Sequence, residues 1–361
     1  MQSGYAGRLA TTDPLMSPPL RVALIGYGSA GRIFHAPLIS HTPGLVLHSV
    51  VSSRHDELRR RFTDLVLHTD VSSALADPAV DAVVIATPNA QHAPLALAAL
   101  RAGKHVLVDK PFALDSSEAA AVVAAAEQAE RVVSVFQNRR FDADFLTLQQ
   151  LLAQGTLGEI AECHSHFDRF RPQVRDRWRE QDVAGSGLWY DLGPHLLDQM
   201  LVAFGWPQAI TAELACQRGE GAVDWFHAVL HYPRLRAVVH AGSLVTAPAP
   251  RFVVHGRAGS WIKHGLDVQE AQLIAGTAPG APGWGLDPVH GEHLWQDADG
   301  VLQRQRVDNQ RGDYRRLYAA FAAAVRGEAA PAVDGAQALR LMQLLDAGRA
   351  SAREGRRISL V

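Results

Sequence analysis

The stretch that decides the fold is RVALIGYGSAG, residues 21–31. Its largely apolar beginning stops at a glycine, which is typical of a buried strand, and a helix-like stretch follows to about residue 40. Between them lies the pattern G-x-G-x-x-G, which in this strand–helix context predicts a dinucleotide-binding turn. Gly26 permits the tight turn, Gly28 lets a diphosphate approach the backbone, and Gly31 lets the helix pack on the strand. The residues expected at the cofactor here are Gly26, Tyr27, Gly28, Ser29, Ala30 and Gly31.

The order of apolar stretches predicts two domains. Up to about residue 138, continuous apolar strands alternate with helices, which predicts a parallel sheet covered on both faces. Beyond that point several segments alternate apolar with polar residues, as half-buried antiparallel strands do. We therefore predict an α/β chain with a flexible tail, a Rossmann dinucleotide-binding domain, and a C-terminal α+β domain with a large open, mainly antiparallel sheet. The expected boundaries are 1–20, 21–138 and 139–361.

Composition excludes several classes of protein. The 361 residues carry a formal net charge of −2, so no global field would hold nucleic acid. Two cysteines cannot form a disulfide framework, and they favour a reducing compartment, so we expect a cytoplasmic protein. No apolar run approaches the ~20 residues that a membrane span needs.

Three residues after the second expected strand indicate which dinucleotide is preferred. NAD-binding folds carry an acid there for the ribose 2′-hydroxyl, whereas this chain has Ser52, Ser53 and Arg54. Two hydroxyls and a guanidinium suit a 2′-phosphate, which a carboxylate would repel. We therefore expect NADP rather than NAD; the alternative is that Arg54 only caps or solvates the next helix.

Two further stretches carry side chains suited to proton transfer. Lys110, in Asp109-Lys110-Pro111, follows the strand at 105–108, at the sheet edge where open α/β sheets bind ligands. Asp191 and His195 lie four residues apart at the start of an apolar helix, a spacing that brings side chains together. A carboxylate beside an imidazole orients it as a general base. The alternatives are a surface lysine, a helix-capping aspartate and a core histidine.

An arginine-rich segment and a histidine pair remain ambiguous. Five arginines fall within residues 169–179, among acidic residues and Trp178, and such a segment either binds a hydroxyl-rich ligand or a partner subunit, or forms a salt-bridged surface. His164 and His166 share one face of an expected strand. Because no third ligand accompanies them in the sequence, no metal site is expected.

Taken together, these motifs resemble the glucose–fructose oxidoreductase / inositol dehydrogenase / MocA (Gfo/Idh/MocA) oxidoreductase family from about residue 21 onward. The resemblance rests on residues 26–31, on DKP at 109–111 where the family usually has Glu-Lys-Pro, and on YDLGPH at 190–195. Three longer strings are similar to its NADP-dependent scyllo-inositol dehydrogenase branch: FHAPLI at 34–39, NRRFD at 138–142 and HFDRFRP at 166–172.

The resemblance implies a role for each matching position. The implied catalytic residues are His195 as general base, Asp191 as its orienting partner, and Lys110 as proton donor or alkoxide stabiliser. Further cofactor contacts are implied at Thr87, Pro88, Asn89, His92, Asp109 and Lys110. The side chains expected to line the substrate are Asn138, Arg169, Trp178 and Tyr190.

The implied activity is NADP-dependent hydride transfer between the nicotinamide and a secondary alcohol of a polyol or cyclic sugar such as scyllo-inositol. The alternatives are an aldose or other sugar oxidoreductase, a biliverdin-reductase-like enzyme, or a non-catalytic NAD(P)-binding regulator. Such a regulator would be expected to lack the lysine or the histidine. The family also implies that the C-terminal sheet mediates homodimers or homotetramers.

Overall fold

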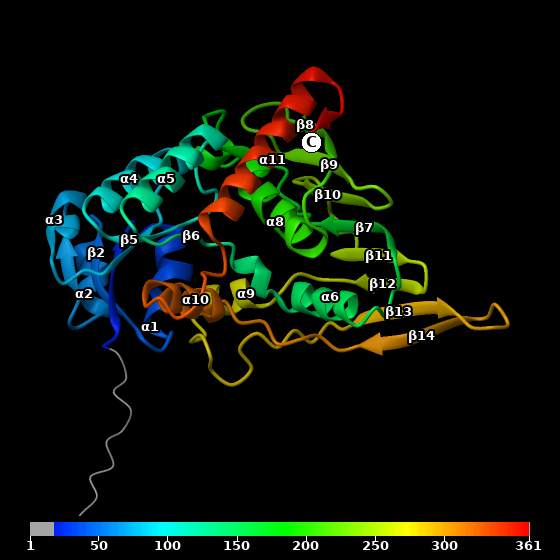
Figure 1. The fold of residues 1–361 in the computed structure, drawn as a ribbon, viewed down its shortest axis with the longest axis horizontal. Coiled ribbons are helices and arrows are strands. Elements are labelled where there is room, and N and C mark those ends of the chain that lie inside the picture. The colour runs from blue at the N-terminus through cyan, green and yellow to red at the C-terminus, as the bar shows by residue number, and fades with distance from the viewer. Residues whose placement is uncertain (1–17, 361) are drawn as a thin grey trace, which may run out of the picture.

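A six-stranded parallel sheet forms the N-terminal part of the molecule (Figure 1). The computed structural model describes residues 18–360, so most of the expected tail at 1–20 lies outside the described residues. The strand order β3-β2-β1-β4-β5-β6 is that of a Rossmann dinucleotide-binding sheet. Its strands are β1 (Leu20–Ile25), β2 (Leu45–Val51), β3 (Val66–His68), β4 (Ala82–Ile85), β5 (His105–Val108) and β6 (Val133–Val135).

Both faces of this sheet are buried, as its continuous apolar strands predict. In β1, Val22 and Leu24 belong to one apolar core, whereas Ala23 and Ile25 belong to the other. Successive side chains of a strand point to opposite faces, so each face must be covered. The helical segments are η1 (Gly31–His35), α1 (Ala36–Ser40), α2 (His55–Arg61), α3 (Val71–Ala76), η2 (Asn89–Gln91), α4 (His92–Arg101) and α5 (Ser116–Gln128).

A nine-stranded mixed sheet forms the second domain, with the order β14-β13-β12-β11-β7-β10-β9-β8-β15. Only the β7–β10 pair is parallel among the strand pairs of this sheet, which confirms the expected mainly antiparallel arrangement. Its strands are β7 (Ile160–His166), β8 (Ala209–Ala215), β9 (Trp225–His231), β10 (Arg236–Gly242), β11 (Phe252–Gly256), β12 (Gly259–Lys263), β13 (Gly291–Gln296), β14 (Leu302–Val307) and β15 (Ile358–Ser359).

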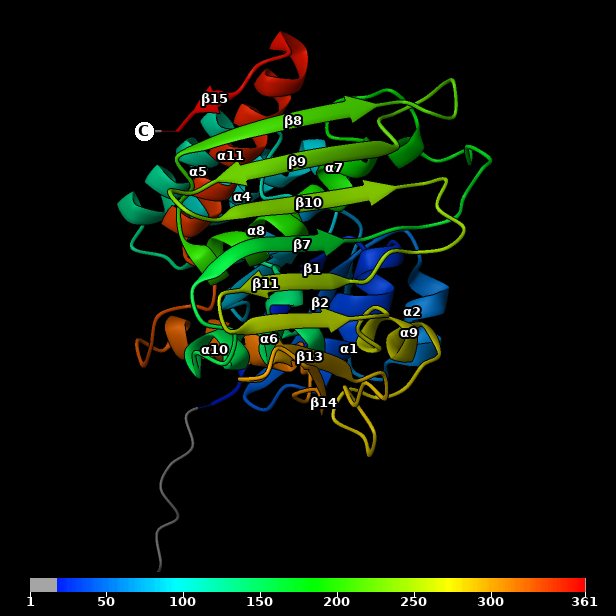
Figure 2. The same ribbon diagram turned by 90° about the vertical axis from the view of Figure 1, so that its right-hand side faces the viewer.

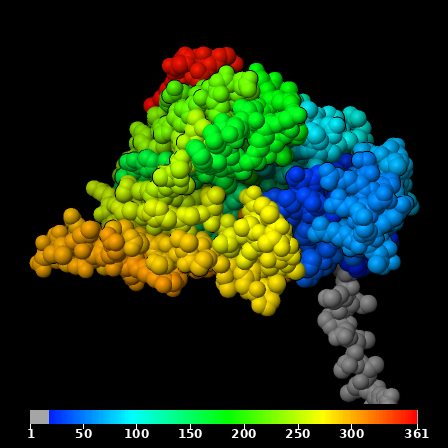
Figure 3. Space-filling view, turned by 180° about the vertical axis from the view of Figure 1, so that it is seen from behind, coloured from blue at the N-terminus to red at the C-terminus, as the bar shows by residue number. Residues whose placement is uncertain are grey.

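Helices cover one face of the second sheet and leave the other free (Figure 2). In β9 the side chains of Phe226, Ala228 and Leu230 are buried against the helices, and the alternate residues are half-buried on the free face. The hairpin β13–β14 extends away from the body of the molecule (Figure 3). The remaining helical segments are η3 (Asn138–Phe141), α6 (Ala143–Ala153), η4 (Trp178–Glu180), α7 (Gly187–Asp191), α8 (Gly193–Phe204), α9 (Gln269–Ile274), α10 (Arg315–Val325) and α11 (Gly335–Glu354).

Trp189 joins α7 to the long helix α11. Its indole is buried, and Nε1 donates a hydrogen bond to the Leu345 carbonyl oxygen at 3.2 Å. A Cβ atom on Gly348 would lie 2.3 Å from Cζ2 of this indole. The glycine therefore makes room for the tryptophan. Within residues 18–360, no helix is both long and apolar enough to cross a membrane.

We predict that Gly348→Ala lowers the free energy of unfolding by about 1–3 kcal/mol, because the added methyl group overpacks the contact with Trp189. Helix propensity alone favours alanine by about 1 kcal/mol, so the sign of the change separates the two effects. Denaturant unfolding measures it, with Gln343→Ala on the exposed side of α11 as the control. A more stable Gly348→Ala protein would contradict the packing.

Candidate active site

The glycine turn between β1 and η1 leaves space in front of its backbone. A Cβ atom on Gly26, where φ is +100°, would lie 2.5 Å from the Ala86 carbonyl oxygen, and one on Gly31 would lie 2.1 Å from the Gly26 carbonyl oxygen. These two glycines therefore permit the turn and its packing on the helix. A Cβ atom on Gly28 would meet nothing within 4 Å, so this side of the turn is open to a ligand. Tyr27 instead points into the core, where its hydroxyl accepts a hydrogen bond from Arg61.

The turn after β4 supplies a second polar group beside the glycine turn. The Thr87 Oγ1 atom is buried and has no hydrogen-bond partner among the described residues, and the Thr87 methyl group lies next to Gly26. A buried hydroxyl without a partner is unusual, and a bound ligand would satisfy it. The open turn and this hydroxyl fit the dinucleotide that the motif implies.

The other expected cofactor residues lie at the ends of neighbouring strands. Ser52, Ser53 and Arg54 follow β2, where the Ser52 hydroxyl accepts a hydrogen bond from the Arg54 backbone N–H. The Arg54 guanidinium is half exposed and lies 3.4 Å from the Glu57 carboxylate. Beyond Pro88, the Asn89 amide donates to the Gly185 carbonyl oxygen. The buried His92 imidazole contacts the carbonyl oxygens of Thr87 and Pro111, so it connects two turns instead of lining the cleft described below.

Lys110 and Arg169 meet at the carboxylate of Asp191. The Lys110 Nζ atom lies 3.0 Å from Asp191 Oδ1 and 2.6 Å from the Asp191 carbonyl oxygen, and Arg169 Nη1 lies 3.1 Å from Oδ2. Burial alone would raise the pKa of Asp191, but the charges of Lys110, Arg169 and Arg179 outweigh it and hold the pKa well below its ordinary value. Asp191 is therefore ionised and fixes the Lys110 ammonium in place.

Asp109 anchors the backbone that carries Lys110. Its carboxylate accepts a hydrogen bond from the Lys110 backbone N–H and lies 3.6 Å from His35 Nε2. Burial would raise the pKa of Asp109, but His35 and Lys110 lower it to about 2. The His35 Nδ1 atom in turn lies 2.6 Å from the Tyr318 hydroxyl of α10, which links this strand end to the second domain.

His195 lies in the first turn of α8, where Pro194 suits the helix start. Its imidazole is buried, and Nδ1 has no hydrogen-bond partner within residues 18–360. Burial, together with the positive charges of Lys110 and Arg139, holds the pKa of His195 well below its ordinary value. The imidazole is therefore neutral and able to accept a proton.

The expected orientation of His195 by Asp191 is wrong in this structure. Both Asp191 oxygens bind cations, and the described residues show no hydrogen bond or ion pair between Asp191 and His195. Asp191 and His195 do not share one continuous helix, as their four-residue spacing had suggested: α7 ends at Asp191 and α8 begins at Gly193. Asp191 positions Lys110 instead.

These groups line one cleft of about 220 Å³ between the two domains. The N-terminal domain lines the cleft with Asp109 and with Ser29 and Ala30 of the glycine turn. Two of the expected substrate residues also line it, Asn138 and Arg169. Trp178 and Tyr190 are not among its lining residues: Arg179 lies over the Trp178 ring, and the Tyr190 hydroxyl donates to the Leu114 carbonyl oxygen.

The arginine-rich segment contributes to this cleft. Seven Lys or Arg side chains and four Asp or Glu side chains line it, although the whole chain has a net charge of −2. Four of the basic residues come from the segment at 169–179, namely Arg169, Arg171, Arg177 and Arg179. Within the part of the chain that the structure describes, the guanidinium groups of Arg171 and Arg179 form no ion pair and donate no hydrogen bond. The segment is therefore part of the site and not only a solvated surface.

Comparison with known proteins identifies the family. Residues 20–137 match the family model described as "Oxidoreductase family, NAD-binding Rossmann fold". Residues 149–360 match the model described as "Oxidoreductase family, C-terminal alpha/beta domain". The chain belongs to the Gfo/Idh/MocA oxidoreductase family. The resemblance stated from the motifs is thereby confirmed, and the chain is an oxidoreductase of a family that acts on sugar or polyol alcohols.

Several relatives in this family match over nearly the full length. The uncharacterized oxidoreductase YdgJ of Escherichia coli is 46% identical over 347 residues, covering 94% of this chain and 98% of that protein. The scyllo-inositol 2-dehydrogenase (NADP(+)) IolW of Bacillus subtilis is 34% identical over 343 residues, covering 94% and 96%. The solved structure of YvaA from Bacillus subtilis covers 95% of this chain and 99% of its own, with a TM-score of 0.92 and 34% identity.

Sequence reasoning missed two parts of this family member's site. Arg139 and Glu270 form an ion pair at the cleft wall although 131 residues separate them, and no local pattern connects them. Arg171 and Arg179 were visible as part of a charged segment, but only the fold shows which arginines face the cleft.

We predict that Gly28→Ala folds normally but binds NADPH at least tenfold more weakly, because its methyl group enters the space that the turn leaves open. Gly31→Ala is expected to destabilise the fold itself, because of the clash with the Gly26 carbonyl oxygen. Quenching of intrinsic fluorescence by NADPH and thermal unfolding measure the two effects separately. Unchanged NADPH affinity in Gly28→Ala would exclude the turn as the diphosphate site.

Proposed function

We propose that this protein is an NADP-dependent oxidoreductase that acts on a secondary alcohol of a polyol or cyclic sugar of the scyllo-inositol type. One observation carries the proposal: an ammonium group from one domain and a neutral imidazole from the other line the same cleft as the glycine turn. A lysine and a histidine of this kind supply proton transfer and charge stabilisation for alcohol oxidation.

The residues of the chain divide the chemistry between them. Neutral His195 accepts the proton of the substrate hydroxyl as general base. Lys110, held by the Asp191 carboxylate, donates a hydrogen bond to the same oxygen and stabilises the developing alkoxide. In reduction, Lys110 or the protonated His195 returns the proton. A bound nicotinamide supplies the hydride acceptor.

Two observations support NADP over NAD. Ser52, Ser53 and Arg54 occupy the end of β2, next to the glycine turn at the end of β1, and no acidic side chain stands among the three. The printed name of the relative IolW specifies NADP(+). Because Glu57 already lies near Arg54, binding of a 2′-phosphate would have to compete with this weak, exposed ion pair.

The free face of the nine-stranded sheet supports a proposal about assembly. We propose that the chain forms a homodimer or homotetramer through this face. Half-buried apolar side chains such as Trp225 and Val229 lie on it beside polar ones, and no helix within residues 18–360 covers it (Figure 2). A non-catalytic regulator is the less favoured alternative, since Lys110 and His195 are both present in the cleft.

A second candidate is an oxidoreductase for a sugar that carries an acidic group. Arg171 and Arg179 line the cleft without an acidic partner in residues 18–360. Burial and the nearby Arg169, Arg175 and Arg177 lower the pKa of Arg171, which reflects mutual repulsion among these cations. A substrate carboxylate or phosphate would relieve that repulsion.

The substrate assay compares inositols and neutral aldoses with aldonates and uronates, each with NADP⁺ and with NAD⁺, at the nicotinamide absorbance. We expect turnover of a neutral polyol with a higher kcat/KM for NADP⁺. Preference for NAD⁺ would contradict the cofactor assignment. Turnover of acidic sugars only, abolished in Arg171→Gln, would establish the second candidate, and NADPH binding without any turnover would favour a regulator.

The pH dependence tests the role of His195. Its lowered pKa predicts that kcat/KM for alcohol oxidation stays constant as the pH falls through 6.5, the ordinary histidine value, and decreases only at lower pH. His195→Gln and Lys110→Met are each expected to reduce kcat by ~10²–10⁴-fold while NADPH binding survives. The exposed Arg234→Ala serves as the control and should keep full activity. Near-normal turnover by either variant would refute its assignment.

A further inference from the structure

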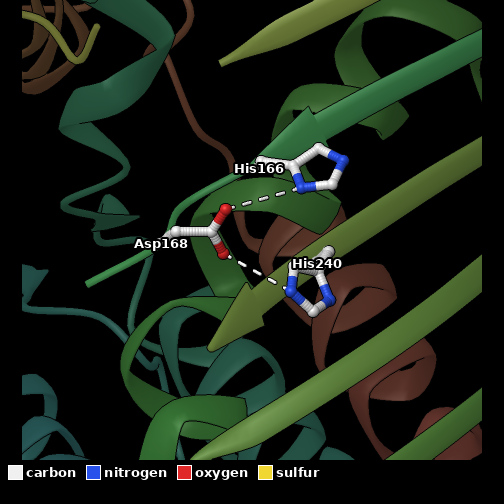
Figure 4. A group of neighbouring side chains, drawn as sticks. All are labelled: His166, Asp168 and His240. Carbon is white, nitrogen blue, oxygen red and sulfur yellow. Dashed lines mark ion pairs between the residues drawn. The ribbon is translucent and has the colours of Figure 1, made fainter. Parts of the chain in front are cut away.

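Three side chains converge on the free face of the nine-stranded sheet, away from the cleft (Figure 4). His166 and His240 are direct partners in the register of the parallel strands β7 and β10. Asp168 follows two residues after His166, so its side chain returns to the same face. One ligand atom from each residue lies within 4.8 Å of the others, and no other such group occurs in residues 18–360.

The buried carboxylate in this group lacks the hydrogen bonds that it needs. The Asp168 side chain is only 2% exposed. Its Oδ2 atom lies 3.7 Å from His166 Nδ1, and its Oδ1 atom lies 3.4 Å from His240 Nε2. The Oδ1 atom and His166 Nδ1 are both buried without a hydrogen-bond partner among the described residues. Burying a carboxylate this way is unfavourable unless a cation compensates its charge.

The distances suit a shared metal ion better than hydrogen bonds. Two ligand atoms that are each about 2.1 Å from one zinc ion lie about 3.4 Å apart at the tetrahedral angle. Each of the two contacts of Asp168 is close to this separation, and they use different carboxylate oxygens, Oδ2 toward His166 and Oδ1 toward His240. Two imidazole nitrogens and one carboxylate group are also donors that divalent transition metals prefer.

We propose that His166, Asp168 and His240 bind one Zn²⁺ ion per chain. The sequence expectation of no metal site considered only His164 and His166; the proposed site keeps His166 and adds Asp168 and, from the neighbouring strand β10, His240. Other histidines on this face have different partners: the His164 ring contacts the Glu162 carboxylate, and His255 lies 2.7 Å from the Ser260 hydroxyl. The His164 ring lies 6.1 Å from the His166 ring and the His227 ring lies 5.9 Å from the His240 ring, so these two histidines border the three proposed ligands.

A metal ion at this site would stabilise the chain segment that carries Arg169. The next residue along the chain is Arg169, which pairs with Asp191 in the cleft. The Arg169 backbone N–H donates to the Gly242 carbonyl oxygen at 2.9 Å, two residues beyond His240. An ion shared by His166, Asp168 and His240 would fix this strand end from the opposite side, and so stabilise the segment that holds Arg169.

The test is calorimetric titration of untagged, chelator-treated full-length protein with Zn²⁺, with metal content measured by atomic absorption and thermal unfolding recorded in parallel. Light scattering establishes the oligomeric state of each sample. We expect one Zn²⁺ per chain and a higher melting temperature with zinc. His240→Ala should bind at least tenfold more weakly and lose the thermal shift.

The matched control is His255→Ala, which removes an exposed histidine from the same face and should bind zinc as the parent does. Equal weakening in both variants would show scattered surface binding and overturn the proposal. Absence of stoichiometric binding by the parent protein would overturn it as well. Because the readouts are binding and stability, failure here leaves the proposed activity untouched.

Discussion

The half-buried carboxylate of Asp191 is the contact on which the whole site depends. It binds Lys110 from the N-terminal domain and Arg169 from the second domain, and its own carbonyl oxygen accepts a further hydrogen bond from Lys110. Taking three charges out of water is expensive, so this cluster adds little net stability. Its effect is to position Lys110: removing Asp191 would leave Lys110 and Arg169 without this shared partner. The domains are thereby held in a relation that places the ammonium group at the cleft.

The two sheets bring these side chains together through the ends of their strands. In a parallel sheet the carboxyl ends of all strands share one edge, so the glycine turn after β1, Thr87 after β4 and Lys110 after β5 become neighbours. The second domain contributes through the start of α8, where His195 lies, and through the segment after β7, where Arg169 lies. Each domain therefore supplies one half of the proposed proton-transfer pair.

The sequence predicts those parts of the site that depend on local order. The glycine turn and the position of Lys110 follow from strand–turn patterns, and the fold class follows from the alternation of apolar segments. The Asp191–His195 pairing failed because one residue, Leu192, separates two helices that the spacing argument had joined. The ion pair of Arg139 with Glu270 and the grouping of His166 with His240 depend on tertiary packing and strand register. Such contacts leave no periodic signal in the chain.

Net composition also conceals the electrostatics of the cleft. A chain of charge −2 concentrates seven basic side chains around one cavity, and the positive charges of Lys110, Arg139 and Arg169 help to lower the pKa of His195 after burial. The same field that keeps the base neutral also stabilises an alkoxide, since both effects disfavour a proton and favour a negative charge. In the proposed mechanism, these positive charges therefore favour alcohol oxidation even when the substrate is uncharged. The positive charge of the cleft therefore serves the proposed reaction first, by stabilising the alkoxide, and selects an acidic substrate only in addition.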